Sequence, residues 1–331
     1  MFDWSKQVIL LTGGTGSFGQ AFTKYLLSHQ PPNILRIYSR DEYKQYQMQQ
    51  EINHPAIRFF IGDVRDKARL SRAMQDVTLV IHAAAMKQIV ACEYNPAEAI
   101  KTNIIGSLNM VDTAIDLGVE RFFGLITDKA VSPINLYGAT KLCMEKLLIQ
   151  GNSYRGSGGT RISCVRYGNV AGSRGSVIPL FHEQKKRGVL TITHKDMTRF
   201  WITLEEGVKF VISCIEKMHG REIFVPKMSS FKVADLVSAI APKTIRTKIT
   251  GIRAGEKLHE DLITIHEAVN TYEFPKFFLI KPDFAFWEEK QVTWWKKGKR
   301  VLPNFSYNSR TNSRFLKVAQ LQKHLKKFGF L

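Results

Sequence analysis

The sequence lacks the features of secreted, metal-binding and membrane-spanning proteins. Its four cysteines are scattered among 331 residues without a C-x-x-C pair, so we expect neither a disulfide framework nor a metal site. No stretch approaches the roughly 20 uninterrupted apolar residues of a membrane span. The first residues, MFDWSK, show no charged leader followed by a long apolar segment. We therefore expect a cytoplasmic protein without a membrane span.

Acidic residues are scarce: 29 Asp and Glu stand against 48 Lys and Arg, a net charge of +19. From Lys290 to Leu331 the chain has eleven basic residues and no acidic one. Such a tail attracts anions, whether a nucleotide substrate, nucleic acid or a membrane surface, although a solvated basic surface explains it equally well. Because aromatic residues are not regularly interleaved with these charges, we expect no nucleic-acid partner.

What the sequence does contain, over its first half, is a regular alternation of short apolar runs and amphipathic segments. We expect strands at residues 8–12, 34–38, 57–61, 78–84, 121–127 and 161–168. Helical patterns lie between them, for example at 18–29, 67–75, 106–118 and 139–150. This alternation predicts an α/β fold, a doubly wound parallel sheet of the Rossmann type with helices on both faces.

The alternation becomes irregular beyond about residue 170, where helical patterns at 205–218, 233–241 and 255–263 are mixed with proline and aromatic residues. We predict a dinucleotide-binding domain over residues 1–172, with a return at about 200–226. A smaller mixed α/β substrate domain would comprise residues 173–199 and 227–331 and would include the basic tail.

The segment TGGTGSFG, residues 12–19, follows the first strand and begins a helix. In a dinucleotide-binding fold, Gly13 allows the tight turn, Gly16 lets a pyrophosphate approach, and Gly19 lets helix and strand pack closely. A mere tight turn is the competing interpretation. The cofactor contacts expected here and after the fourth strand are Gly13, Thr15, Gly16, Ser17, Phe18, Gly19, Ala83 and Ala84.

The end of the second strand distinguishes NADP from NAD. An acidic residue there would bind the ribose 2′-hydroxyl of NAD, whereas a guanidinium suits the 2′-phosphate of NADP. Ser39 and Arg40 therefore favour NADP, and Asp41 keeps NAD as the alternative. The adenine is expected near Asp63, for which a helix cap is the other interpretation. The expected contacts are Ser39, Arg40, Asp41, Lys44, Asp63 and Val64.

Tyr137 and Lys141 lie four residues apart in a helical segment, so they share one face. An ammonium and a bound nicotinamide would lower the pKa of the phenol and make Tyr137 a base during hydride transfer. Thr127 supplies a hydroxyl at the end of the preceding strand. With the glycine loop upstream, this pattern resembles the extended short-chain dehydrogenase/reductase superfamily, and the resemblance adds Tyr137 and Lys141 to the cofactor contacts.

Asp128 and Lys129 follow Thr127 directly. They supply an acid and a base that a simple dehydrogenase or epimerase does not need. Together with YSRDE, FFIGDVRD, HAAAMK, INLYGATKL, RYGNVAGSRGSVIP and GIRAGEKLHE, they resemble the inverting UDP-N-acetylglucosamine 4,6-dehydratases, such as those of pseudaminic acid biosynthesis. That resemblance implies Tyr137 as the base for C4 oxidation, Lys129 as the base at C5 and Asp128 as the acid at the C6 hydroxyl, with Thr127 bonded to the sugar. An exposed ion pair is the alternative for Asp128 and Lys129.

The resemblance also implies a UDP-sugar substrate, a homo-oligomer and a tail segment that closes the site. Lys87 would reach the sugar or its phosphate, and Asn169 the diphosphate. An ion pair with an acid such as Glu205 is the alternative for Arg199. The expected substrate contacts are Lys87, Asn169, Ser173, Arg174, Gly175, Ser176, Val177, Arg199, Arg253, Glu256, Tyr307, Asn308, Ser309 and Arg310.

Two other functions are compatible with the sequence. An epimerase on the same scaffold would use Tyr137 without eliminating water, and a non-catalytic nucleotide- or nucleic-acid-binding protein would use the basic surface. A further question is the charge of Lys129, which must be neutral to act as a base. Lys87 and Lys141 would lower its pKa and Asp128 would raise it, and the sequence does not weigh these effects.

Overall fold

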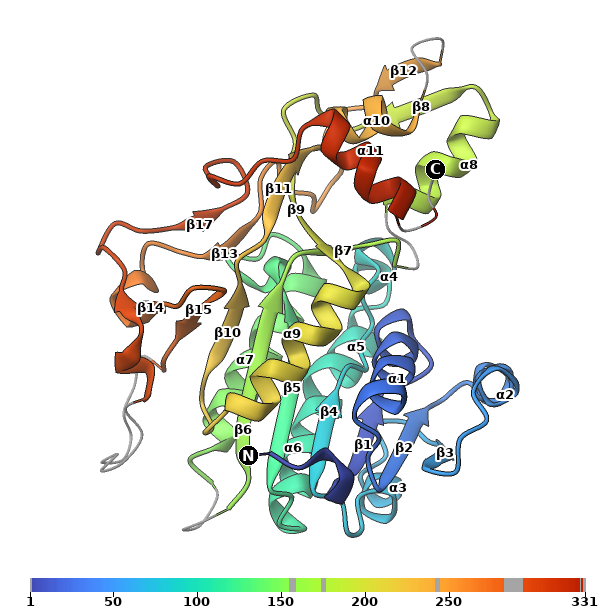
Figure 1. The fold of residues 1–331 in the computed structure, drawn as a ribbon, viewed down its shortest axis with the longest axis vertical. Coiled ribbons are helices and arrows are strands. Elements are labelled where there is room, and N and C mark those ends of the chain that lie inside the picture. The colour runs from blue at the N-terminus through green and yellow to red at the C-terminus, as the bar shows by residue number, and fades with distance from the viewer. Residues whose placement is uncertain are drawn as a thin grey trace.

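The computed structural model describes residues 2–154, 159–173, 177–241, 245–282, 294–327 and 329. Within these ranges, ten strands form one sheet in the order β16-β14-β15-β10-β6-β5-β4-β1-β2-β3 (Figure 1). Strands β1 to β6 are Val8–Thr12, Ile34–Ser39, Ile57–Ile61, Leu79–His82, Arg121–Thr127 and Arg161–Tyr167. They run parallel to one another and to β10 (Ile223–Pro226), which confirms the predicted doubly wound sheet.

An antiparallel extension lengthens the sheet beyond β10. It consists of β15 (Phe277–Ile280), β14 (Thr271–Glu273) and β16 (Lys299–Arg300). Mixed edges of this kind are common on otherwise parallel sheets.

Helices cover both faces of the sheet, as Figure 1 shows. On one face α1 (Ser17–His29) packs against α9 (Leu204–Lys217), and on the other α6 (Gly106–Asp116) packs against α3 (Lys67–Ala73) and α7 (Leu136–Gly151). The shorter α2, α4 and α5 are Glu42–Glu51, Ile89–Tyr94 and Pro96–Ile100. In the described part of the chain, no helix is both long and apolar enough to cross a bilayer.

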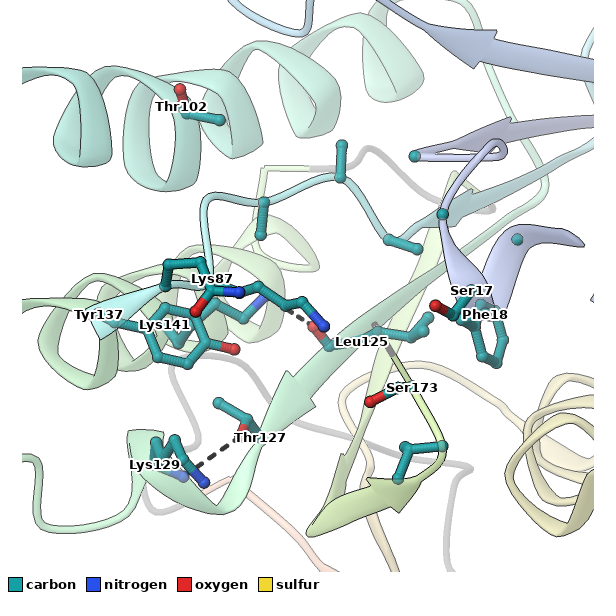
Figure 2. A pocket seen from close by; sticks show the side chains of 18 of the residues that line it. Ser17, Phe18, Lys87, Thr102, Leu125, Thr127, Lys129, Tyr137, Lys141 and Ser173 are labelled. Carbon is teal, nitrogen blue, oxygen red and sulfur yellow. Dashed lines mark hydrogen bonds between the residues drawn. The ribbon is translucent and has the colours of Figure 1, made fainter. Parts of the chain in front are cut away.

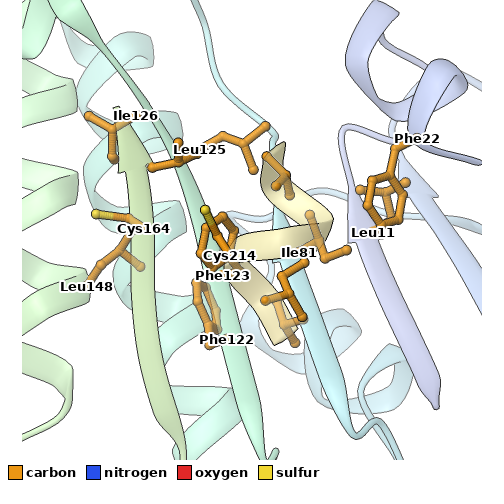
Figure 3. Close-up of a cluster of buried hydrophobic side chains, with 14 of the residues drawn as sticks. Leu11, Phe22, Ile81, Phe122, Phe123, Leu125, Ile126, Leu148, Cys164 and Cys214 are labelled. Carbon is orange, nitrogen blue, oxygen red and sulfur yellow. The ribbon is translucent and has the colours of Figure 1, made fainter. Parts of the chain in front are cut away.

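The core is densest around β5, whose side chains are buried on both faces of the sheet (Figure 3). Phe122 and Phe123 are fully buried and, being neighbours in a strand, point to opposite faces. Gly124 lets α7 approach, since a Cβ there would lie 2.2 Å from Leu148 Cδ1. This double burial explains why the central strands appear as continuous apolar runs in the sequence.

The remaining elements form smaller sheets with their own hydrophobic cluster. A three-stranded sheet consists of β7 (Asn169–Ala171), β9 (Thr198–Thr203) and β11 (Ser229–Lys232). Two further sheets have two strands each: β8 (Val189–Ile192) with β12 (Arg246–Ile249), and β13 (Asp261–Ile263) with β17 (Tyr307–Asn308). Helices α8 (Val177–Lys186), α10 (Val233–Ile240) and α11 (Val318–Lys327) complete this part. Its cluster includes Phe181, Trp201, Leu236 and Leu321, whereas α9 packs in the larger core. The predicted domain boundaries stay a prediction.

One predicted element is wrong. Residues 255–263 were expected to be helical, but they form turns followed by β13. The physical reason is a long-range pairing of β13 with β17, which the local pattern does not contain. Glu260 is held in this extended form because its carbonyl accepts a hydrogen bond from Ser309 N at 2.8 Å.

Candidate active site

A cavity of about 670 Å³ lies at the carboxyl ends of β1, β2, β4, β5 and β6. Ligands bind at this edge in doubly wound folds. Its lining includes every residue predicted for catalysis or cofactor binding, and Lys87, Asn169, Ser173, Arg253 and Glu256 from the predicted substrate contacts. Several lining residues were not among the predicted contacts, namely Gln88, Thr102, Tyr167, Gly168 and Leu204, although Tyr167 and Gly168 stand in the RYGNVAGSRGSVIP motif.

The glycine loop has the geometry that its spacing predicts. Gly13 has φ +65°, and a Cβ there would lie 2.9 Å from the backbone of Ala83 and Ala84. At Gly19 a Cβ would lie 2.3 Å from the Gly14 carbonyl oxygen, so α1 and the loop are in direct backbone contact. Gly16 caps α1 without a side chain, which leaves the first N–H groups of the helix facing the cavity.

A buried hydrogen-bond network joins the loops after β1 and β4. Thr12 Oγ1 lies 2.7 Å from His82 Nδ1 and accepts hydrogen bonds from the backbone N–H groups of Ala83 and Ala84, each at 3.2 Å. Burial lowers the pKa of His82 to about 3, so this histidine is neutral. His82 therefore fixes the two loops that form the floor of the cavity.

The end of β2 places Asp41 and Arg40 in different roles. Asp41 caps α2, because its carboxylate accepts a hydrogen bond from Lys44 N at 3.0 Å and pairs with the Lys44 ammonium. The Arg40 side chain is 58% exposed and lies 3.7 Å from Asp63. Asp63 does not cap α3, whose cap is Asp66. The carboxylate of Asp41 is thus engaged by its own helix, and the guanidinium of Arg40 faces the cavity mouth.

Tyr137 and Lys141 project from α7 beside the end of β5 (Figure 2). Lys141 Nζ donates to the Leu125 carbonyl at 2.7 Å, and burial lowers its pKa to about 7. Burial raises the pKa of Tyr137 to about 12, against the lowering effects of the Lys129 charge and the Thr127 hydroxyl. Lys129 is therefore the cation whose charge lowers the pKa of Tyr137. The predicted influence of Lys141 on that pKa stays a prediction.

Asp128 and Lys129 are not an exposed ion pair. Asp128 is fully buried, and its Oδ1 accepts hydrogen bonds from Thr127 Oγ1 at 2.8 Å and from Lys129 Nζ at 3.1 Å. A second buried carboxylate, Glu260, lies 3.4 Å from Lys129 Nζ. Burial would lower the pKa of Lys129, but Asp128 and Glu260 outweigh it and raise that pKa above its ordinary value. Lys129 is thus held as an ammonium by two acids.

Glu260 was missed by the sequence analysis. It ends the GIRAGEKLHE segment, whose pattern does not indicate which of its acids turns inward. Arg199 joins the same cluster: its Nη2 lies 3.5 Å from Glu256 and its Nε 3.6 Å from Glu260. Arg199 thus pairs with acids, as the alternative interpretation expected, but Glu205, named there as the example, pairs with Lys209 instead.

The tail residues lie away from this cavity. Tyr307 donates a hydrogen bond to the Met228 carbonyl at 2.9 Å, and Asn308 donates one to Asp261 at 2.7 Å. Ser309 is fully buried against Thr198. The structure places Val177, Arg199, Tyr307, Asn308, Ser309 and Arg310 outside the lining of the cavity. Arg174, Gly175 and Ser176 fall outside the described residues.

The chain matches a known family over most of its length. The family model described as "Polysaccharide biosynthesis protein" matches residues 9–282. The chain belongs to this family. It is also 51% identical to the inverting UDP-N-acetylglucosamine 4,6-dehydratase of Campylobacter jejuni, with 93% of this chain and 94% of that protein covered. The resemblance predicted from the motifs is confirmed.

Other matches extend the comparison. The UDP-glucose 4-epimerase of Rickettsia conorii is 42% identical, with 84% of this chain and 83% of that protein covered. The solved structure of Pen from Bacillus thuringiensis superimposes with a TM-score of 0.90 at 35% identity and full coverage of both chains. A dTDP-glucose 4,6-dehydratase from Streptomyces venezuelae, solved with NAD, has a TM-score of 0.67 at 20% identity, with 76% of this chain and 86% of that chain covered. These structures confirm the predicted fold class.

Proposed function

We propose that this chain dehydrates UDP-N-acetylglucosamine at C4 and C6 with inversion at C5. The product would be a UDP-2-acetamido-2,6-dideoxy-β-L-arabino-hex-4-ulose for bacterial surface or flagellar sugars of the pseudaminic acid type. The observation that carries the proposal is the presence of Tyr137, Asp128 and Lys129 in one cavity. The likeness to the Campylobacter jejuni dehydratase supports the same activity.

The residues around the glycine loop fit a nicotinamide dinucleotide. Gly13 makes the tight turn against the backbone of Ala83 and Ala84, where a side chain has no room, and the helix begun by Gly16 offers N–H groups to a pyrophosphate. The NAD bound to the Streptomyces venezuelae dehydratase supports a cofactor of this class. We propose NADP rather than NAD, because Arg40 is exposed at the cavity and Asp41 is engaged by α2. The chemistry that this cofactor supplies when bound is hydride transfer, from C4 and back to C6 of the sugar.

The chain's own groups would handle the protons. Tyr137 would take the proton of the C4 hydroxyl as the hydride leaves. The resulting ketone acidifies the C5 proton, which Lys129 Nζ would take. Asp128, a carboxylate until then, would receive that proton across its 3.1 Å hydrogen bond with Lys129 Nζ and donate it to the C6 hydroxyl, which leaves as water. The unpartnered Oδ2 of Asp128 suits this last step. A proton returned to C5 on the opposite face would complete the inversion.

The direct test is NMR of the purified protein with UDP-N-acetylglucosamine in deuterated water, without added reductant. We expect a new 6-methyl signal, deuterium at C5 and the ring couplings of an L-arabino sugar. A methyl product that keeps the original C5 configuration would contradict inversion. A product epimerised at C4 that retains its C6 hydroxyl would contradict dehydration.

The second candidate is a UDP-sugar 4-epimerase, which the similarity to the Rickettsia conorii epimerase favours. An epimerase returns the hydride to C4 and has no use for an acid and a base beside Tyr137. Loss of activity on removal of Tyr137, with full activity on removal of Lys129, would support it.

We also propose that the protein is a cytoplasmic homo-oligomer. Tyr94 of α4 is 86% exposed, which is unusual for an aromatic side chain and would suit a contact with a second copy. Light scattering after size-exclusion chromatography should give a mass above that of one chain, and a monomer at micromolar concentration would contradict the proposal.

A further inference from the structure

Asp128 and Lys129, which line the cavity, also belong to a buried charge cluster centred on Glu260. This residue is 2% exposed and precedes β13. Its Oε1 lies 3.4 Å from Lys129 Nζ and 3.6 Å from Arg199 Nε. The backbone of Glu260 is fixed by Ser309, whose Oγ accepts a hydrogen bond from Glu260 N at 2.9 Å. The carboxyl group is therefore held directly behind Lys129.

The two carboxyl groups beside Lys129 differ in how their charge is stabilised. Asp128 Oδ1 accepts hydrogen bonds from Thr127 Oγ1 and Lys129 Nζ. Glu260 Oε1 has only the two longer contacts, and its Oε2 has no hydrogen-bond partner among the described residues. Hydrogen bonds to a carboxylate favour its charged form, so Glu260 is the better proton acceptor. Burial acts in the same direction and raises the pKa of Glu260.

We propose that Glu260 is a positioning residue that takes the ammonium proton of Lys129 and leaves Lys129 neutral for the C5 proton. This inference rests on the proposed function. In the transfer an N–H bond at Nζ breaks and an O–H bond at Oε1 forms, so a charged pair becomes a neutral pair and no proton leaves the protein. The separation of 3.4 Å is about 0.5 Å longer than an ordinary N–H···O bond, and such contacts tighten in substrate complexes.

The other charges around the pair act in opposite directions on Glu260. Arg199 and Lys257 favour the carboxylate form of Glu260, whereas burial and Asp128 favour its neutral form. Arg199 itself is held by the carbonyl groups of Thr198 and Lys257, at 2.7 and 2.9 Å. The charged and titratable groups that face the pair are Asp128, Tyr137, Arg199 and Lys257, and Glu256 pairs with Arg199.

An internal proton transfer has a consequence for the pH profile. As long as Lys129 and Glu260 share one proton, the fraction of neutral Lys129 does not change with pH. Without Glu260, the remaining acceptor beside Lys129 is Asp128, whose two hydrogen bonds favour its charged form. Lys129 then becomes neutral by losing its proton to solvent, and that fraction rises about tenfold per pH unit until Lys129 is fully deprotonated. A residue that merely supports the fold would not change the slope.

The test compares the wild type with Glu260→Gln, which keeps the side-chain volume but accepts no proton. Dehydration of UDP-N-acetylglucosamine is measured from about pH 6.5 to about pH 9, with substrate deuterated at C5 to show that proton removal limits the rate. We expect a flat profile for the wild type. For Glu260→Gln we expect a lower rate at neutral pH that rises about tenfold per unit, and for Glu260→Asp a flat profile again.

Glu222→Gln is the matched control, because Glu222 is another buried carboxyl, bonded to Ser163 Oγ at 2.5 Å and to Trp294 Nε1 at 2.9 Å. It should lower the melting temperature without changing the slope of the profile. Parallel profiles for the wild type and Glu260→Gln, or a tenfold rise per pH unit in the wild type itself, would overturn the role of Glu260. The proposed function would stand in either case. Absence of any dehydration by the wild type would overturn the proposed function and this inference together.

Discussion

The two halves of the cavity differ in which atoms form them, backbone in one half and charged side chains in the other. The half around the glycine loop is made of backbone: Gly13 approaches Ala83 and Ala84, and α1 begins at Gly16. The half around Lys129 depends on side chains from segments that are distant in sequence, because Glu260 and Arg199 meet behind Lys129. The first half has one geometry dictated by short-range sterics, whereas the second depends on how buried charges balance.

This contrast predicts how each half responds to substitution. A change in the backbone half should act on cofactor affinity and strain, since there is no side chain to protonate. A change in the charged half should act on rates and on pH dependence while leaving cofactor affinity intact. The following predictions test that division, beginning with the largest effect.

Lys129→Ala should reduce dehydration by about 10³- to 10⁴-fold, because the C5 proton loses its acceptor. NADP affinity should be unchanged, since Lys129 lies on the charged side of the cavity. Steady-state rates and cofactor titration measure the two quantities. The control is Lys186→Ala, whose ammonium forms an exposed pair with Glu183. Weakened NADP binding in Lys129→Ala would break the proposed division of the cavity.

Gly13→Ala should weaken NADP binding by about 100-fold and lower stability by more than the roughly 1–2 kcal/mol that a left-handed backbone costs. The added Cβ would lie 2.9 Å from the Ala83 backbone. Gly118→Ala is a matched control with nearly the same φ, +66°, and nothing within 4 Å of its Cβ. It should show the backbone cost without the loss of affinity. Isothermal titration and thermal unfolding distinguish the two variants, and equal affinities would contradict the predicted clash.

Arg40→Ser should weaken NADP binding about tenfold and leave NAD binding unchanged, because only the 2′-phosphate contacts the guanidinium. Binding of both cofactors is measured by titration. Arg58→Ala, on the neighbouring β3, serves as the control for a general loss of positive charge. A parallel loss of NAD and NADP affinity in Arg40→Ser would show that Arg40 acts on the shared part of the dinucleotide.

The last prediction concerns Lys141 and the dependence of stability on pH, rather than a rate or a cofactor affinity. Its folded pKa is about 7 and its ordinary value is 10.5, so between these limits the unfolded chain binds more protons than the folded chain. Raising the pH through this window should therefore stabilise the wild type relative to Lys141→Met, by no more than about 5 kcal/mol. Chemical denaturation at several pH values measures the difference. A constant difference would contradict the lowered pKa.

The same division explains what the sequence revealed. The six central strands and the glycine loop are local patterns, and they lie where they were predicted. Residues 255–263 were mispredicted because β13 is stabilised by β17, far along the chain. Glu260 could not be selected from its neighbours, since its burial depends on that same long-range pairing.

The tail residues Tyr307 and Ser309 show why a predicted ligand contact is harder to judge from the sequence. Ser309 fixes Glu260 and Tyr307 binds the Met228 backbone, so these polar atoms are used within the protein. A polar residue in a motif does not reveal whether it faces a ligand or a neighbouring strand. Their contact with a UDP-sugar stays a prediction.

The most direct test of the central claim is to follow the hydride with UDP-N-acetylglucosamine deuterated at C4. In ordinary water, the account predicts a product whose C6 methyl group carries one deuterium, because the hydride removed at C4 is returned to C6 as water is lost. A product with inverted configuration at C4 that keeps its C4 deuterium and its C6 hydroxyl would contradict the account and identify an epimerase.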